Sequence, residues 1–262
     1  MAARRKKAAR KTGARKAPRK KTPRRKAAAP KRKRGPRTPP SPPPRWGLAL
    51  AGDWSRGAFV AGALDALHRA GRMGRFPVVA ATGSAALAAA LAALGRWREL
   101  TDLFTALTPR RLARARHGWM GNPAGRFWLS SATGVPSLYR GDALRRLVHA
   151  EVDPSTPRDA PGECHFVAPA LRDGAPRSVS SRTGEPGDVL AAIVAAASPA
   201  VLLPPVPVGA TRAPCVAATT AHVLGVLLPA MDGGDGVVVV DTETAPPARD
   251  GPYRDVAKVA RR

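Results

Sequence analysis

The chain has 262 residues and a formal net charge of +26. This length accommodates one domain of roughly 200 residues with an appendage, and two cysteines are too few for a disulfide-rich secreted scaffold or a four-cysteine zinc site. The charge is uneven: residues 1–45 hold 20 basic and no acidic side chains, which leaves 24 basic against 18 acidic residues in the rest of the chain. We therefore expect a tail at 1–45 and a folded domain at 46–262.

The tail is rich in Lys, Arg, Pro and Ala, and its only large apolar residue is Met1. Nothing in it offsets an ordering entropy of roughly 1–2 kcal/mol per residue, so we expect the tail to be disordered. Its charges would bind nucleic acid independently of sequence, because each phosphate contact releases counterions. An anionic membrane surface would satisfy the same charges, and a solubilising appendage without a partner is the third interpretation.

The sequence shows no sign of export or of a membrane span. No apolar stretch follows a short basic region at the N-terminus. The most apolar segment, 78–94, is mostly alanine and is interrupted by Thr82, Gly83 and Ser84, which is typical of a buried core segment. These features predict a cytoplasmic protein.

The first half of the domain alternates short apolar runs with helical patterns. Residues 47–51 and 77–81 have the length and composition of strands. An amphipathic helix is expected between them, because polar residues recur at helical spacing at Asp65, His68, Arg69 and Arg72. Residues 84–94 lack a polar face and predict a buried helix. Strand, helix, strand and helix in this order predict a parallel sheet with helices packed on it.

The second half adds further helices and strands. Helices are expected over 97–107, after Asp142 and after Asp188, both of which we interpret as N-caps, and over 252–262. Strands are expected over 165–170 and 177–181, around a turn at 173–174. The run D-G-V-V-V-V-D at 235–241 is typical of a strand in the centre of a parallel sheet.

Five segments resemble, in order, motifs of the patatin-like phospholipase family. They are the loop G-D-W-S-R-G at 52–57, the strand-to-helix turn A-A-T-G-S-A-A-L at 80–87, the strand–turn–strand at 168–180, the segment at 188–206 and the strand at 235–241. The resemblance covers about residues 46–245 and implies a three-layer α/β/α fold with a mainly parallel central sheet. It also implies a Ser–Asp dyad that hydrolyses lipid esters, an oxyanion hole in the glycine loop and an acyl lipid as ligand.

The loop departs from the family pattern. Gly52, Arg56 and Gly57 match the first glycine, the basic residue and the last glycine of the family's loop, whereas Asp53 and Trp54 stand where the family has glycine. A carboxylate beside a site for an oxyanion is electrostatically unfavourable, and Trp is bulky where backbone must approach a substrate.

The two dyad positions depart as well. Gly83 aligns with the nucleophilic serine, and Ala217 aligns with the aspartate. A displaced dyad of Ser84 and Asp232 is the best catalytic candidate if the chain is active. Ser84 also fits a serine in the first turn of a helix that bonds to unsatisfied N–H groups, and Asp232 fits an ordinary glycine-rich turn, D-G-G-D-G.

We expect no metal and no cofactor. None of the five histidines lies at metal-ligand spacing, and Cys164 and His165, adjacent on a strand, must point to opposite faces. The chain contains no phosphate-binding loop of the G-x-x-x-x-G-K-[ST] type.

Three functions follow from these observations. The leading one is a patatin-like domain that has lost its dyad and binds or scaffolds at an acyl-lipid pocket or on a polyanion. The second is an active serine acyl hydrolase with a displaced dyad. The third is a nucleic-acid-binding protein that acts through its tail, with the domain as carrier.

Overall fold

The computed structural model describes residues 44–115, 137–153 and 162–242. The tail at 1–45, except for its last two residues, and the helix expected over 252–262 lie outside this range.

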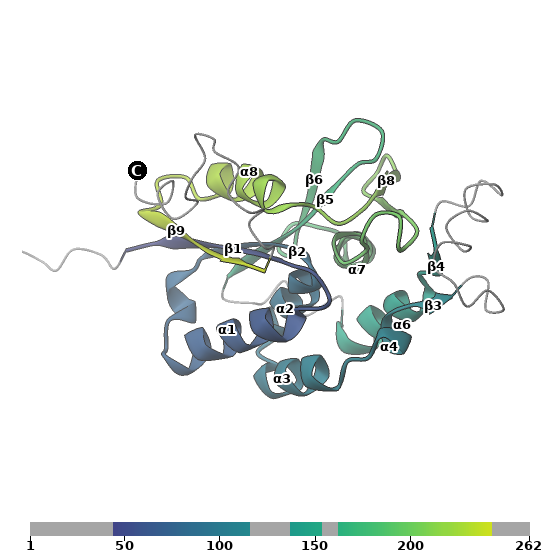
Figure 1. Cartoon of the computed structure of the whole chain (residues 1–262). Coiled ribbons are helices and arrows are strands. Elements are labelled where there is room, and N and C mark those ends of the chain that lie inside the picture. Colours follow the sequence, from purple (N-terminus) through teal and green to yellow (C-terminus); the bar gives the residue numbers. More distant parts are fainter. Residues whose placement is uncertain (1–43, 116–136, 154–161, 243–262) are drawn as a thin grey trace, which may run out of the picture. The chain divides into compact units, whose positions relative to one another are not determined.

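The centre of the domain is a five-stranded sheet in the order β6-β5-β2-β1-β9 (Figure 1). Its strands are β1 (Trp46–Gly52), β2 (Val78–Gly83), β5 (Glu163–Pro169), β6 (Pro176–Ser180) and β9 (Gly236–Asp241). All neighbours are parallel except β5 and β6, which form the expected antiparallel pair. The mainly parallel sheet expected from the sequence is therefore confirmed.

Helices cover both faces of the sheet (Figure 1). One face carries α1 (Gly57–Arg69), α2 (Ser84–Ala93), α3 (Trp97–Ala106), α6 (Asp142–Glu151) and α7 (Pro186–Ala196), and the other carries α8 (Thr220–Ala230). Two separate apolar clusters, one on each face, hold the layers together. This is the three-layer α/β/α arrangement.

Short elements complete the described chain. They are a 3₁₀ turn (Met73–Arg75), α4 (Pro109–Leu112), β3 (Arg114–Ala115), β4 (Tyr139–Arg140), β7 (Val206–Val208) and β8 (Ala213–Cys215). The strands β7 and β8 form a small antiparallel hairpin next to α7.

Helix α2 explains how the core positions the end of β2. Every residue from Ser84 to Ala92 is buried, and seven of the ten residues of the helix are alanine. Because alanine side chains are small, α2 packs against β1, β2, α1, α3 and α7 at once. The turn from β2 into α2 is thereby held on all sides.

Three expectations from the sequence need correction. Strand β9 pairs only with β1 within the described residues and lies at the edge of the sheet, with its valines half-buried, rather than in the centre. A continuous apolar run does not by itself distinguish these positions. Asp142 is the first residue of α6, behind the N-cap Gly141, and Asp188 lies in the first turn of α7, behind the N-cap Glu185.

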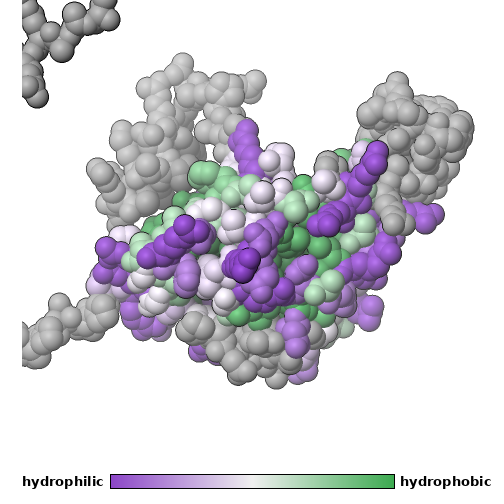
Figure 2. Space-filling model, turned by 90° about the horizontal axis from the view of Figure 1, so that it is seen from below, coloured by the Kyte–Doolittle hydropathy of each residue, from purple (hydrophilic) through white to green (hydrophobic). Residues whose placement is uncertain are grey.

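The outer surface of the helix layer is largely polar. Arg69, Arg98 and Asp102 expose most of their side chains there. Figure 2, which views the molecule from the side of α1 and α3, shows hydrophilic residues with apolar patches between them. Within the described residues, no helix has both the length and the apolar character needed to cross a membrane.

Candidate functional site

The loop at 52–57 and the turn at 82–85 meet at the carboxyl edge of the sheet. The parallel register pairs Gly52 of β1 with Gly83 of β2, the last residues of the two strands. Ligand sites of open α/β sheets lie at this edge. The two segments in which the sequence resembles a hydrolase are therefore adjacent in space.

Gly83 has the backbone of a strand-to-helix elbow. Its φ of 66° and ψ of −149° fall in a region that is essentially restricted to glycine. A Cβ atom built at this position would lie 1.8 Å from the carbonyl oxygen of Gly52. The space that a nucleophilic side chain would occupy at the apex is thus filled by a backbone acceptor.

Ser84 lies one residue beyond the apex, as the first residue of α2, and is fully buried. Its hydroxyl donates to the carbonyl oxygen of Asp53 at 2.7 Å, with the carbonyl oxygen of Gly52 at 3.3 Å. From the sequence, we expected the Ser84 hydroxyl to bond to unsatisfied N–H groups in the first turn of its own helix. Instead it ties the loop to α2, because the loop turns its carbonyl groups toward the elbow.

Two of the amide groups of the loop are engaged away from the elbow. The N–H of Asp53 donates to the hydroxyl of Thr242, and the N–H of Arg56 donates to the Asp53 carboxylate, which also accepts from Ser55. An oxyanion hole requires N–H groups that point at the reacting oxygen. These two N–H groups instead stabilise the loop itself.

Trp54 and Arg56 fix the loop to distant parts of the chain. The indole N–H of Trp54 donates to the carbonyl oxygen of Ala197 at 2.8 Å, and its ring stacks on Phe104 at 6.3 Å between centroids. The Arg56 guanidinium donates to the carbonyl oxygen of Thr242 at 2.6 Å. Trp54 therefore replaces a conformationally free glycine with an anchored aromatic side chain.

Gly57, at the start of α1, packs tightly against its neighbours. A Cβ atom there would lie 2.6 Å from the Phe104 ring and 3.0 Å from the Ser84 hydroxyl. Glycine is required at this position because α1 approaches α3 and the elbow closely.

The segment at 217–218 lies beside the end of β2. The N–H of Ala218 donates to the Thr82 hydroxyl at 2.8 Å, and the N–H of Ala217 donates to the carbonyl oxygen of Ser198. Ala217, which the resemblance aligns with the catalytic aspartate, therefore belongs to a segment that is bonded to the end of β2, and it carries a methyl group instead of a carboxylate.

Asp232 lies at the amino ends of the parallel strands, whereas Ser84 lies at their carboxyl ends. It is exposed and precedes β9, where Asp235 pairs with the backbone of Arg45 ahead of β1. Ser84 follows the other end of the parallel strands. A strand length of six residue steps corresponds to about 20 Å. The structure does not bring Ser84 and Asp232 together, and the displaced dyad is not formed.

Cys164 and His165 lie on β5 with opposite orientations. Cys164 is buried in the larger core, and burial together with the nearby Glu163 carboxylate raises the pKa of its thiol to about 12. Burial lowers the pKa of His165, an effect partly opposed by the Glu163 carboxylate 3.4 Å from its Nε2. Within the described residues, no three His, Cys, Asp or Glu side chains are grouped as metal ligands.

Sequence reasoning missed two threonines that organise this edge. The Thr82 hydroxyl accepts a hydrogen bond that joins β2 to the 217–218 segment. Thr242 accepts one from the Asp53 N–H at its hydroxyl and one from the Arg56 guanidinium at its carbonyl oxygen. Both are buried. A buried threonine at the end of an apolar strand is a detectable signal, since a buried hydroxyl requires a partner, but the partner cannot be identified from local sequence.

The chain is similar to proteins of one known family. The family model described as patatin-like phospholipase matches residues 48–245. Among solved structures, VipD from Legionella pneumophila matches with a TM-score of 0.48 and 12% identity over 76% of this chain, and the type III effector protein ExoU matches with a TM-score of 0.35 and 18% identity over 62%. A search of curated proteins gave no match.

The chain spans half of the VipD chain and 40% of the ExoU chain. The family model, in contrast, accounts for most of the present sequence and includes the loop, the elbow and the final strand. The chain belongs to the patatin-like phospholipase family.

Proposed function

We propose that this chain is a patatin-like protein that does not hydrolyse esters at its elbow and acts by binding. The observation that carries the proposal is the apex itself: Gly83 has no side chain, and the Gly52 carbonyl oxygen occupies the place where one would lie. A carbonyl oxygen can neither attack an ester nor stabilise a developing oxyanion, because it is an acceptor of partial negative charge. The methyl group at Ala217 supports the same conclusion.

The arrangement of Ser84 also supports loss of activity. Its hydroxyl is buried and already donates to the carbonyl oxygen of Asp53, with the carbonyl oxygen of Gly52 also nearby. A nucleophilic serine requires a base that accepts its proton and an open path to the substrate. Ser84 has backbone oxygens in place of the base, which fits a structural role.

The experiment is to treat the full chain with a fluorophosphonate probe and a chromogenic short-chain ester. We expect neither labelling nor turnover above background. Labelling that disappears in Ser84→Ala, while Ser198→Ala retains it, would overturn the proposal. Ser198 is a matched control, since it is equally buried and also donates to a backbone carbonyl, that of Val194.

We further propose that the tail at 1–45 binds polyanions. Its 20 basic and no acidic residues support this, because each basic residue placed on a phosphate adds counterion release. In an electrophoretic shift assay, we expect binding to duplex DNA at low salt and its loss on raising the salt concentration. Deletion of residues 1–45 should abolish the shift and leave the melting transition of the domain unchanged.

Vesicles of anionic lipid form the second arm of this assay. Binding to vesicles but not to DNA would assign the tail to a membrane surface. Binding that persists after deletion of residues 1–45 would contradict any role of the tail in recognition.

A further inference from the structure

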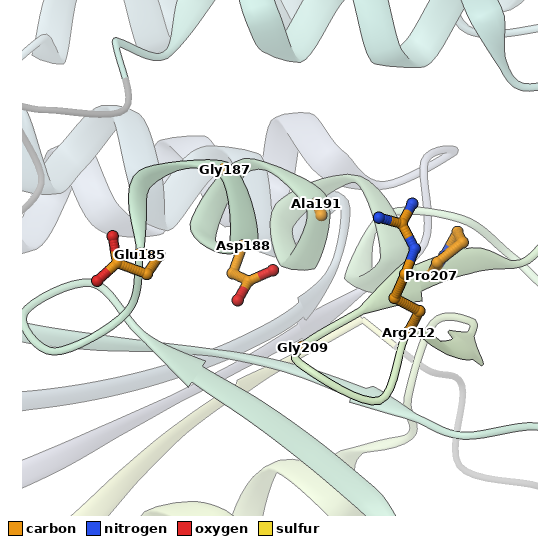
Figure 3. A pocket seen from close by; sticks show the side chains of 7 residues that line it. All are labelled: Glu185, Gly187, Asp188, Ala191, Pro207, Gly209 and Arg212. Carbon is orange, nitrogen blue, oxygen red and sulfur yellow. The ribbon is translucent and has the colours of Figure 1, made fainter.

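A hollow of about 390 Å³ lies between the start of α7 and the β7–β8 hairpin (Figure 3). Glu185, Asp188 and Ala191 line it from the helix, and Pro207, Gly209 and Arg212 line it from the hairpin. Its volume falls within the range of small-molecule sites. The elbow lies beyond the other end of α7, about 16 Å along an eleven-residue helix, so this hollow is separate from the site described above.

Opposite charges stand on its opposite walls. Figure 3 shows Asp188 extending from α7 toward the hairpin and Arg212 extending from the hairpin toward α7. Among the described residues, neither side chain forms a hydrogen bond or ion pair with another. The Asp188 carboxylate and the Arg212 guanidinium are therefore too far apart for a direct hydrogen bond or ion pair.

Three other acidic residues of the described chain do form ion pairs. Asp65, Asp142 and Asp173 each pair with an arginine four residues later. Acidic residues at the N-terminus of a helix are stabilised by its dipole, which accounts for Glu185 at the N-cap of α7 and Asp188 in its first turn. The helix dipole does not explain why the Arg212 guanidinium lies across the hollow from these two carboxylates.

We propose that this hollow binds a small zwitterion whose ammonium group and anionic group are several bonds apart. Asp188 and Glu185 would receive the ammonium group. Arg212 would receive the anion, since a planar guanidinium bonds carboxylate or phosphate through two parallel N–H groups. Ala191 and Pro207 provide apolar contact for the carbon atoms between the two charges. The inference goes beyond the proposed function and does not depend on it.

Phosphoethanolamine is the probe, and it carries both charges in one molecule. Calorimetric titration of the full chain is compared with inorganic phosphate alone and ethanolamine alone. We expect phosphoethanolamine to bind more tightly than either half. Asp188→Asn and Arg212→Gln should each weaken binding by about ten-fold or more, the size of one hydrogen bond to a charged group.

Arg182→Gln is the matched control, because Arg182 is an exposed arginine ahead of α7 that does not line the hollow. The tail is the same in all variants, so its affinity for phosphate cancels in the comparison. Melting temperatures of the variants separate a loss of ligand contact from a loss of fold.

Vesicles of phosphatidylethanolamine identify the source of the ligand. Competition by vesicles assigns a lipid headgroup, and binding of the free molecule without competition assigns a soluble zwitterion; both results support the proposal. Three results would overturn it: no binding at about 10 mM, a far weaker affinity than any site of function requires; equal affinity for phosphate alone; or equal losses in Arg182→Gln and Arg212→Gln.

Discussion

At position 83, a single backbone atom, the carbonyl oxygen of Gly52, occupies the place of a side chain. The residue combines a positive φ with contact between its missing Cβ and the carbonyl oxygen of Gly52. Either feature alone favours glycine. Together they close the elbow to any L-amino acid unless the neighbouring strand end moves, because the obstacle is backbone and not a flexible side chain.

Substitution by alanine tests how strongly this position requires glycine. Gly71 has a similar φ of 63° and open space around its Cβ direction, so Gly71→Ala measures the cost of a positive φ alone, about 1–2 kcal/mol. We expect Gly83→Ala to lower the free energy of unfolding by at least about 2 kcal/mol more, since the ψ of −149° and overpacking against the Gly52 carbonyl group both add to that cost. Urea denaturation of both variants measures the difference. Equal losses would show that the Gly52 carbonyl group moves aside freely.

At the scale of elements, the loop between β1 and α1 is held by contacts that lie far away in sequence. Trp54 reaches the end of α7 and the ring of Phe104 in α3, and Arg56 reaches the residue after β9. The loop therefore links α3 and α7 to the carboxyl end of the sheet. The Trp54 anchor lies where the family pattern has glycine.

Trp54→Phe tests this anchor. The substitution keeps an aromatic ring against Phe104 but leaves the buried Ala197 carbonyl group without its indole donor. We expect a loss of about 1–2 kcal/mol in the free energy of unfolding. Trp97→Phe is the control, because Trp97 stacks on His68 and the described structure records no hydrogen bond from its indole. A loss no larger than that of the control would contradict the anchoring role.

At the scale of the whole molecule, stability should fall in alkaline solution because of a buried thiol. Burial raises the pKa of Cys164 to about 12 from an ordinary value of 9.0. Between these two pH values the thiol ionises in the unfolded chain and stays protonated in the folded one, so the unfolded state binds fewer protons. The free energy of unfolding therefore decreases as pH rises from 9 to 12.

Cys164→Ala should make this decrease shallower, by up to about 1.4 kcal/mol per pH unit. Denaturation of the original chain and the variant at several pH values above 9 measures the two slopes. Burial also raises the pKa of the Cys215 thiol, so part of the decrease remains in the variant. Identical slopes would show that Cys164 ionises in the folded protein.

The strand and helix pattern of the domain was accessible without coordinates because it depends on local periodicity. The strands at 47–51 and 77–81 and the buried helix from Ser84 were all found where expected, within one or two residues. The expected central position of β9 was wrong. An apolar run indicates burial only approximately, and it does not indicate which strands lie beside it.

The sequence by itself determined the concentration of basic residues at 1–45, the α/β class, the family resemblance and the absence of a hydroxyl at position 83. These depend on composition, spacing and residue identity, which are properties of short stretches of chain. Only the tertiary structure decided that the Gly52 carbonyl oxygen occupies the place of a side chain at position 83, that the Ser84 hydroxyl is bonded to the loop, and that Asp232 lies at the opposite ends of the strands from Ser84. Each of these depends on strand register, which joins residues that are 31 to 190 positions apart and so leaves no local signal.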